Sequence, residues 1–103
     1  MQLSLSGNLA QLTKGTKVTV NTVLPGPTRT EGVESFIGGL YPGLTKGESE
    51  KRFLRENRPT TLIERLIDPQ EIGDLVAYVA SPRGAAINGA ALRIEGGLLH
   101  NVV

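Results

Sequence analysis

The apolar residues of this chain are spaced so that strands and helices can be predicted from it. Residues 18–24, VTVNTVL, form a near-continuous apolar run that is broken by Asn21 and Thr22. Such a run is typical of a strand covered on both faces, as in parallel sheets. The Pro-Gly-Pro sequence of residues 25–27 then stops the strand, because proline fixes φ and glycine lets another group approach its backbone closely. We therefore expect a buried strand over 18–24 that ends in a rigid turn, where open α/β sheets bind ligands.

An amphipathic helix is predicted before this strand. Leu5, Leu9 and Leu12 stand at i, i+4 and i+7, which gives a helix over residues 1–14 one apolar face. Gly15 provides the stop, since glycine readily adopts the left-handed conformation that closes helices.

A second helix and a second strand are predicted near the carboxyl end. In the sequence DPQE of residues 68–71, Asp68 can cap the helix, Pro69 suits the first helical position and Glu71 can complete a capping box. The apolar residues that follow with helical spacing predict one buried face: Ile72, Leu75, Val76 and Val79. Ser81 and Pro82 end the helix, and a strand is expected over residues 90–95. Parallel pairing of the two strands, joined by a right-handed crossover, would make an α/β fold.

The middle of the chain has weaker signals. Residues 31–36 can form one helical turn, which Gly38-Gly39 together with Tyr41-Pro42-Gly43 then break. Residues 48–57 regain helical character before Pro59. We expect a mobile stretch between them. Residues 62–67 have helical spacing but lie between two prolines, so a helix and an extended link are both consistent with the pattern.

Composition excludes several classes of function. With 103 residues, 39% hydrophobic residues and a net charge of +1, the chain suits one domain at most. It has no cysteine, which excludes disulfides, thiolate catalysis and cysteine-based zinc sites, and a Ser-His-Asp arrangement would depend on the sole histidine, His100. Scattered cations argue against nucleic acid, and no apolar run approaches the ~20 residues that span a bilayer. We expect no metal site, no membrane contact and a cytoplasmic location.

Three segments resemble the short-chain dehydrogenase/reductase family. VTVNTVLPGPTRT is similar to the family's strand and PG-x-x-x-T segment, DPQEIGDLVAYVASP to the helix before its last strand, and ING-AALRIEGG to that strand and its terminal Gly-Gly. The resemblance covers almost the whole chain, but only the family's carboxyl-terminal part. It implies a single partial Rossmann-like domain over residues 1–103, with two parallel strands, flanking helices and a lid-like segment at about 31–59.

The catalytic set of the family is missing from these 103 residues. Neither the Gly-rich fingerprint nor the Ser and Tyr-x-x-x-Lys residues are present, and the residues four positions after Tyr41 and Tyr78 are Thr45 and Pro82. We therefore assign no catalytic residue. The sequence reads as a carboxyl-terminal fragment of an NAD(P)-dependent carbonyl/alcohol oxidoreductase, inactive alone, and we expect no NAD or NADP on this chain by itself.

The resemblance also implies a set of binding residues. Pro25 and Gly26 would pack against the nicotinamide, the Thr28 backbone would meet its carboxamide, and the Thr30 hydroxyl would bond the carboxamide or pyrophosphate. Without the resemblance, LPGPT would be only a turn. In the lid, four apolar residues would line a substrate pocket, or equally would anchor a loop to the core: Phe36, Tyr41, Phe53 and Leu54.

A second hypothesis comes from a different class of protein. The chain would be a non-enzymatic oligomerising or interaction module, or a truncated gene product without activity. Under either hypothesis we expect a homo-oligomer, with a twofold dimer as first choice, because two strands make a poor sheet and the first helix presents an unpartnered apolar face.

Overall fold

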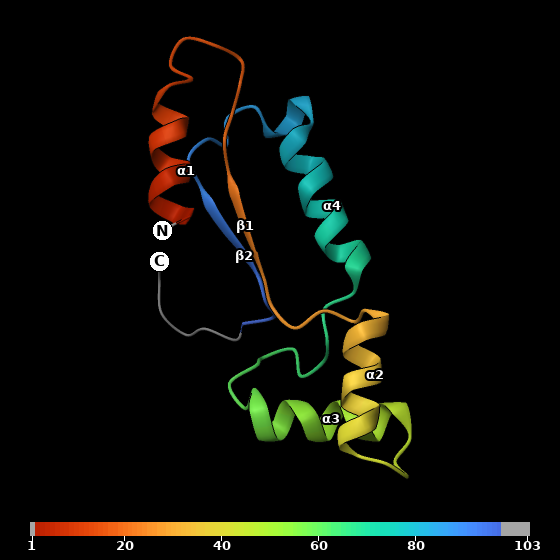
Figure 1. Ribbon diagram of the computed structural model, residues 1–103. Coiled ribbons are helices and arrows are strands. Elements are labelled where there is room, and N and C mark those ends of the chain that lie inside the picture. Colours follow the sequence, from red (N-terminus) through yellow and green to blue (C-terminus); the bar gives the residue numbers. More distant parts are fainter. Residues whose placement is uncertain (1, 98–103) are drawn as a thin grey trace.

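A computed structural model of the chain describes the backbone of residues 2–97 and the side chains of residues 5–97 (Figure 1). His100 and the apolar tail lie outside these residues. The helices are α1 (Gln2–Gln11), α2 (Glu31–Leu40), α3 (Lys46–Asn57), α4 (Pro69–Ala80) and the 3₁₀ turn η1 (Pro82–Gly84). The strands are β1 (Thr22–Pro25) and β2 (Ala91–Ile94).

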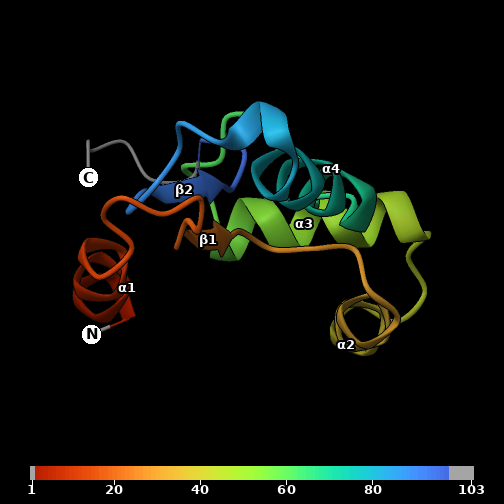
Figure 2. The same ribbon diagram turned by 90° about the horizontal axis from the view of Figure 1, so that it is seen from above.

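The two strands are parallel neighbours, as predicted. Their register pairs Thr22 with Ala91 and Pro25 with Ile94. In both views, α1 and α4 flank the strands on opposite sides, and α2 and α3 lie beyond their carboxyl ends (Figures 1 and 2). The result is an elongated α/β arrangement with principal extents of 57 × 25 × 20 Å.

Strand β1 is shorter than the predicted 18–24 and ends one residue later. The reason is that side-chain amides bind the backbone before the strand. Asn88 Oδ1 accepts from the Val20 N–H at 2.9 Å, and Asn21 Oδ1 accepts from the Ala90 N–H at 3.0 Å. These two asparagines hold the segments before β1 and β2 side by side without a regular strand ladder. The bonded residues are 68 and 69 positions apart in the sequence, so no local pattern indicates the pairing.

The predicted apolar faces exist, but they are incompletely covered within residues 5–97. Helix α1 ends at Gln11, three residues earlier than predicted, so Leu12 follows it in a turn. Leu5 and Leu9 on α1 are 60% and 44% exposed, Leu12 is 80% exposed, and on α4 no residue is fully buried. The strand expected to be covered on both faces is only half-buried, and Val18 before it is exposed. Two strands offer each flanking helix too narrow a surface to bury a whole apolar stripe.

The most buried apolar cluster lies instead around residues 31–59, the segment predicted to be lid-like, for which we keep the name lid. Ile37 of α2, Leu54 of α3 and Leu66 of the following link pack together, and Val33, Tyr41 and Phe53 lie against them. The prediction that Gly38 and Gly39 break this region is wrong, because α2 continues to Leu40. A Thr30 cap at its start and the buried Ile37 inside it outweigh the low helix propensity of glycine.

The starts of α3 and α4 and the conformation of residues 62–67 agree with the sequence predictions to different degrees. Thr45 accepts a hydrogen bond from the Glu48 N–H and starts α3 two residues earlier than predicted. Helix α4 begins as predicted, with Asp68 and Glu71 forming a complete capping box and Pro69 in the first position. Residues 62–67, left open by the sequence, form an irregular link with bends and a φ of 53° at Glu64, so the segment is neither a helix nor an extended strand. No helix in the described part of the chain is long and apolar enough to cross a bilayer.

Candidate functional site

The turn after β1 is fixed against the end of β2. The Gly26 N–H donates to the Ile94 carbonyl at 3.0 Å, which extends the ladder by one bond. A Cβ built on Gly26 would stand 2.8 Å from Glu95 Cα and 3.2 Å from its carbonyl oxygen. The close approach expected at this glycine is therefore made by the chain's own backbone, and any other residue here would displace β2.

Behind the turn, the chain pairs with the link that precedes α4. The Ile67 N–H donates to the Pro27 carbonyl at 2.8 Å, and the Arg29 N–H donates to the Ile67 carbonyl at 2.7 Å, so that Thr28 and Ile67 form an isolated parallel bridge. Ile67 itself is only 3% exposed. This bridge fixes the Thr28 backbone, and it was missed by sequence reasoning because the two segments are far apart along the chain.

The two threonines of the turn are held differently. Thr28 Oγ1 donates to the Gly26 carbonyl at 2.9 Å, and the Thr28 N–H has no acceptor within residues 2–97. Thr30 is the N-cap of α2, where its Oγ1 accepts from the Val33 N–H at 3.2 Å. Because that bond uses a lone pair, the Thr30 hydroxyl proton is left to donate to a ligand oxygen. The turn thus presents one backbone donor and one hydroxyl donor.

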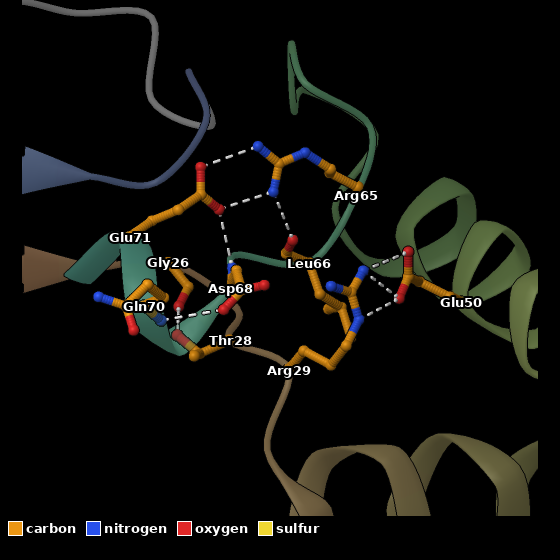
Figure 3. A network of polar contacts seen from close by, with 9 residues as sticks. All are labelled: Gly26, Thr28, Arg29, Glu50, Arg65, Leu66, Asp68, Gln70 and Glu71. Carbon is orange, nitrogen blue, oxygen red and sulfur yellow. Dashed lines mark hydrogen bonds and ion pairs between the residues drawn. The ribbon is translucent and has the colours of Figure 1, made fainter. Parts of the chain in front are cut away.

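A network of hydrogen bonds fixes the link that precedes α4 beside the turn (Figure 3). Arg65 donates to both carboxylate oxygens of Glu71, at 2.7 and 2.9 Å, and Glu71 Oε1 accepts from the Asp68 N–H at 2.9 Å. Hydrogen bonds from Arg65, and then from the Asp68 N–H, lower the pKa of Glu71 from 4.5 to about 2. The hydrogen bond to Glu71 in turn raises the pKa of Arg65. Glu71 therefore stays ionised at neutral pH and fixes Arg65 and the start of α4 together.

A second ion pair joins the turn to the lid. Arg29 Nη2 lies 3.0 and 3.2 Å from the two carboxylate oxygens of Glu50 on α3, and Arg29 Nε lies 3.3 Å from one of them (Figure 3). The pair borders a cavity of about 330 Å³ between α2 and α3. Its lining combines charged and apolar residues: Arg29, Glu34, Lys46 and Glu50 with Ile37, Leu44 and Leu66.

The four residues predicted to line a lid pocket are divided between two roles. The Phe36 and Phe53 rings meet edge to face, with centroids 6.5 Å apart, and Phe36 is 61% exposed. Leu54 is buried in the lid core and borders a separate cavity of about 300 Å³. None of the four lines the 330 Å³ cavity. The structure therefore brings Phe36 and Phe53 together, and Leu54 lies in the buried cluster against which Phe53 packs.

Tyr41 is held by charged neighbours rather than left open to a substrate. Its hydroxyl donates to Glu56 at 3.0 Å, and the guanidinium of Arg52 lies 4.9 Å from the ring centre. Desolvation, and then the hydrogen bond to Glu56, raise the pKa of Tyr41. This is the opposite of the lowered pKa that a lysine neighbour gives a proton-donating tyrosine. Among the described residues, no group of His, Asp or Glu side chains is placed to bind a metal.

Comparisons with known proteins agree with this geometry. The chain is 59% identical over 104 residues to an uncharacterized oxidoreductase of Bacillus subtilis, YvaG, and 35% identical over 91 residues to NADPH-dependent aldehyde reductase 2 of Arabidopsis thaliana. These matches cover 99% and 88% of this chain, but only 39% and 29% of the relatives. The chain therefore spans well under half the length of the proteins it matches.

The fold is found in solved structures as well. L-sorbose reductase of Gluconobacter frateurii, crystallised with NADPH and L-sorbose, superposes with a TM-score of 0.82 at 22% identity, over 97% of this chain and 38% of that one. Residues 3–99 match the family described as enoyl-(acyl carrier protein) reductase. Together with the PG-x-x-x-T turn and the parallel strands, this match shows that the chain belongs to the short-chain dehydrogenase/reductase family.

Proposed function

We propose that this chain forms the nicotinamide side and the substrate lid of an NAD(P)-dependent oxidoreductase that acts on carbonyl or alcohol substrates. The observation that carries the proposal is the turn at residues 25–30, fixed at the carboxyl ends of two parallel strands with its donors directed by hydrogen bonds. The likeness of the chain to an NADPH-dependent aldehyde reductase and to a reductase crystallised with NADPH supports a nicotinamide cofactor.

The residues of the turn fit one edge of such a cofactor. Pro25 and Gly26 offer a flat surface without a protruding side-chain donor, on which a nicotinamide ring can pack. The Thr28 N–H suits the carboxamide oxygen, because it has no acceptor within residues 2–97. The Thr30 hydroxyl can donate to a carboxamide or phosphate oxygen while it still caps α2. The bound nicotinamide would supply the hydride, and these residues would orient its ring.

The lid would meet the substrate through its aromatic pair. Phe36 is exposed and Phe53 is half-buried, whereas Tyr41 is paired with Glu56 and Leu54 is buried. Of the four candidates, the two phenylalanines are therefore the better substrate contacts. An apolar or aromatic carbonyl compound would suit their surfaces.

Proton donation must come from outside these 103 residues. Tyr41 has a raised pKa and a carboxylate partner, and Tyr78 is followed at i+4 by Pro82 instead of lysine. We therefore propose that the chain alone does not transfer hydride. An assay of the purified chain with NADH and NADPH on a panel of aldehydes and ketones tests this, and any turnover would contradict it.

A chimera tests the positive half of the proposal. In YvaG, the segment matching this chain would be replaced by the chain itself, giving what we call the YvaG chimera. We expect it to bind NADH or NADPH in a calorimetric titration with affinity close to that of intact YvaG. If YvaG binds a dinucleotide and the chimera is folded but binds none, the proposed function is wrong.

A second candidate function is a non-enzymatic assembly module. It is favoured by one observation, the exposure of Leu5 and Leu9 on α1 and of Leu12 directly after it. A folded YvaG chimera that binds no dinucleotide, together with a purified chain that self-associates, would support the module over the oxidoreductase.

A further inference from the structure

Arg29 occupies a position between the two candidate cofactor contacts. It separates Thr28 from Thr30, and its own N–H donates to the Ile67 carbonyl at 2.7 Å. Its side chain points away from the strands and reaches α3, where Glu50 accepts bonds from Nη2 and Nε (Figure 3). A single residue thus connects the turn, the link before α4 and a lid helix.

The geometry of this ion pair makes it a directional connection. A guanidinium that engages both oxygens of a carboxylate fixes orientation as well as distance. The side chains of Arg29 and Glu50 are 34% and 20% exposed, so the pair is shielded in part from solvent. Glu34 of α2 also lies 4.0 Å from Arg29 and 3.8 Å from Lys46, so opposite charges alternate around the cavity between the lid helices.

Helix α3 is attached to the turn by two routes. Leu54 packs on Leu66, and the next residue, Ile67, is hydrogen-bonded to the backbone of the turn. The Arg29–Glu50 pair is the direct polar contact between α3 and a side chain of the turn. A shift of α3 away from the turn would therefore break this pair or displace Arg29 together with the flanking Thr28 and Thr30.

We propose that Arg29 is a positioning residue that couples lid helix α3, through Glu50, to the cofactor-facing turn; this inference rests on the function proposed above. With the pair formed, α3 is closed over the cavity and the Thr28 and Thr30 donors are held in place. Ordering the turn therefore favours the closed lid, and the closed lid favours the ordered turn, since such coupling is reciprocal.

Amide exchange in the 103-residue chain tests the coupling without a ligand. The readout is the Ile67 amide, which donates to Pro27 inside the turn and keeps the same local sequence in every variant. Glu50→Ala should raise its exchange rate roughly three- to tenfold, as expected for a partly shielded ion pair. Glu56→Ala is the matched control, because it removes a carboxylate from the same helix whose partners, Arg52 and Tyr41, lie within the lid.

A double-mutant cycle separates coupling from general loosening of the lid. If Glu50 acts on the turn through Arg29, then Glu50→Ala added to Arg29→Met should change Ile67 exchange little beyond Arg29→Met alone. Equal effects of Glu50→Ala and Glu56→Ala, or full additivity in the cycle, would overturn the proposal.

The YvaG chimera extends the test to the cofactor. There, Glu50→Ala should weaken dinucleotide affinity by the same three- to tenfold, whereas Glu56→Ala should not. A chimera that binds the dinucleotide equally well with and without Glu50 would overturn the coupling. A folded chimera that binds no dinucleotide would contradict the proposed function. The double-mutant cycle on Ile67 amide exchange would then decide by itself whether Arg29 couples the lid to the turn.

Discussion

Gly26 lies against Glu95 so closely that a Cβ on the glycine would stand 2.8 Å from the Glu95 Cα. The contact is between backbones, so a rotation of side chains cannot relieve it. Replacing this glycine must move β1 and β2 apart where their ladder ends, at the Gly26 N–H and the Ile94 carbonyl.

Gly26→Ala should therefore destabilise the fold. Overpacking of this kind costs about 1–3 kcal/mol, which a urea titration of the free energy of unfolding can measure. Gly73→Ala is the matched control, because Gly73 lies in α4 with nothing within 4 Å of its built Cβ, and alanine there should stabilise by about 0.5–1 kcal/mol. A Gly26→Ala variant as stable as the unsubstituted chain would contradict the close approach.

Thr30 combines a structural role with a proposed binding role, and substitutions can separate them. Thr30→Val removes the cap of α2 and should cost about 1 kcal/mol of stability. Thr30→Asp keeps a capping oxygen but places a negative charge where a dinucleotide phosphate would lie. We expect the aspartate variant of the chain to be about as stable as the parent, and the same variant of the YvaG chimera to lose dinucleotide affinity.

Thr30→Ser is the control for both effects, since serine retains the cap and the hydroxyl. Stability comes from urea unfolding and affinity from calorimetric titration. If the aspartate variant binds the dinucleotide as well as the serine variant does, the Thr30 hydroxyl does not face a phosphate.

The sequence predicted local features of the fold, although it did not indicate that Thr30 caps α2. Signals that act within a few residues were interpreted correctly, such as the Asp68 and Glu71 capping box and the end of β1 at the Pro-Gly turn. The face of α4 predicted to be buried is not, since no residue of this helix is fully buried and Val76 is 47% exposed. The parallel pairing of the strands also followed, because the apolar runs and the intervening helix allow few alternatives.

The contacts that fix the site could not be predicted in this way. Three pairings join segments that lie 21 to 69 residues apart: Asn21 with Ala90, Arg29 with Glu50, and Thr28 with Ile67. In none of them does the sequence around one residue indicate its partner. The lid was misjudged for a related reason. Gly38 and Gly39 are poor helix formers, but burial of Ile37 against Leu54 and Leu66 overrides local propensity.

The ion pair of Glu71 should make stability depend on pH in an acidic window. The folded chain holds this carboxylate at a pKa of about 2, against 4.5 without its partners, so it binds the proton less readily when folded. The stabilisation is therefore fully present above about pH 4.5 and is lost as pH falls towards 2. Urea midpoints measured between pH 2 and 7 would follow this loss.

Glu71→Gln should flatten the curve in that window. Glutamine can still accept the Asp68 N–H bond of the capping box, but it removes the charge that pairs with Arg65. The difference in stability between parent and variant should thus be largest near neutral pH and vanish near pH 2. Arg65→Met, which removes the same pair from the other side, should flatten the curve too. Parallel curves for parent and variants would show that the pair makes no contribution.

The purified chain should form a twofold dimer. Its sheet has two strands, whereas about three with a covered face are normally needed for independent stability. Val76 on α4 is 47% exposed, so this helix offers an apolar surface for such a contact. Burial of this surface against its own copy would cover the apolar side chains that two strands leave in water.

Sedimentation equilibrium at micromolar concentration should give twice the chain mass of 11.0 kDa. Val76→Glu should shift the chain towards the monomer, because the dimer would have to bury an unpaired carboxylate at its interface. Leu9→Glu tests the exposed face of α1 as the alternative contact, since Leu9 is 44% exposed. A stably folded parent chain that sediments at 11.0 kDa would contradict the dimer, and dissociation by Leu9→Glu alone would assign the interface to α1.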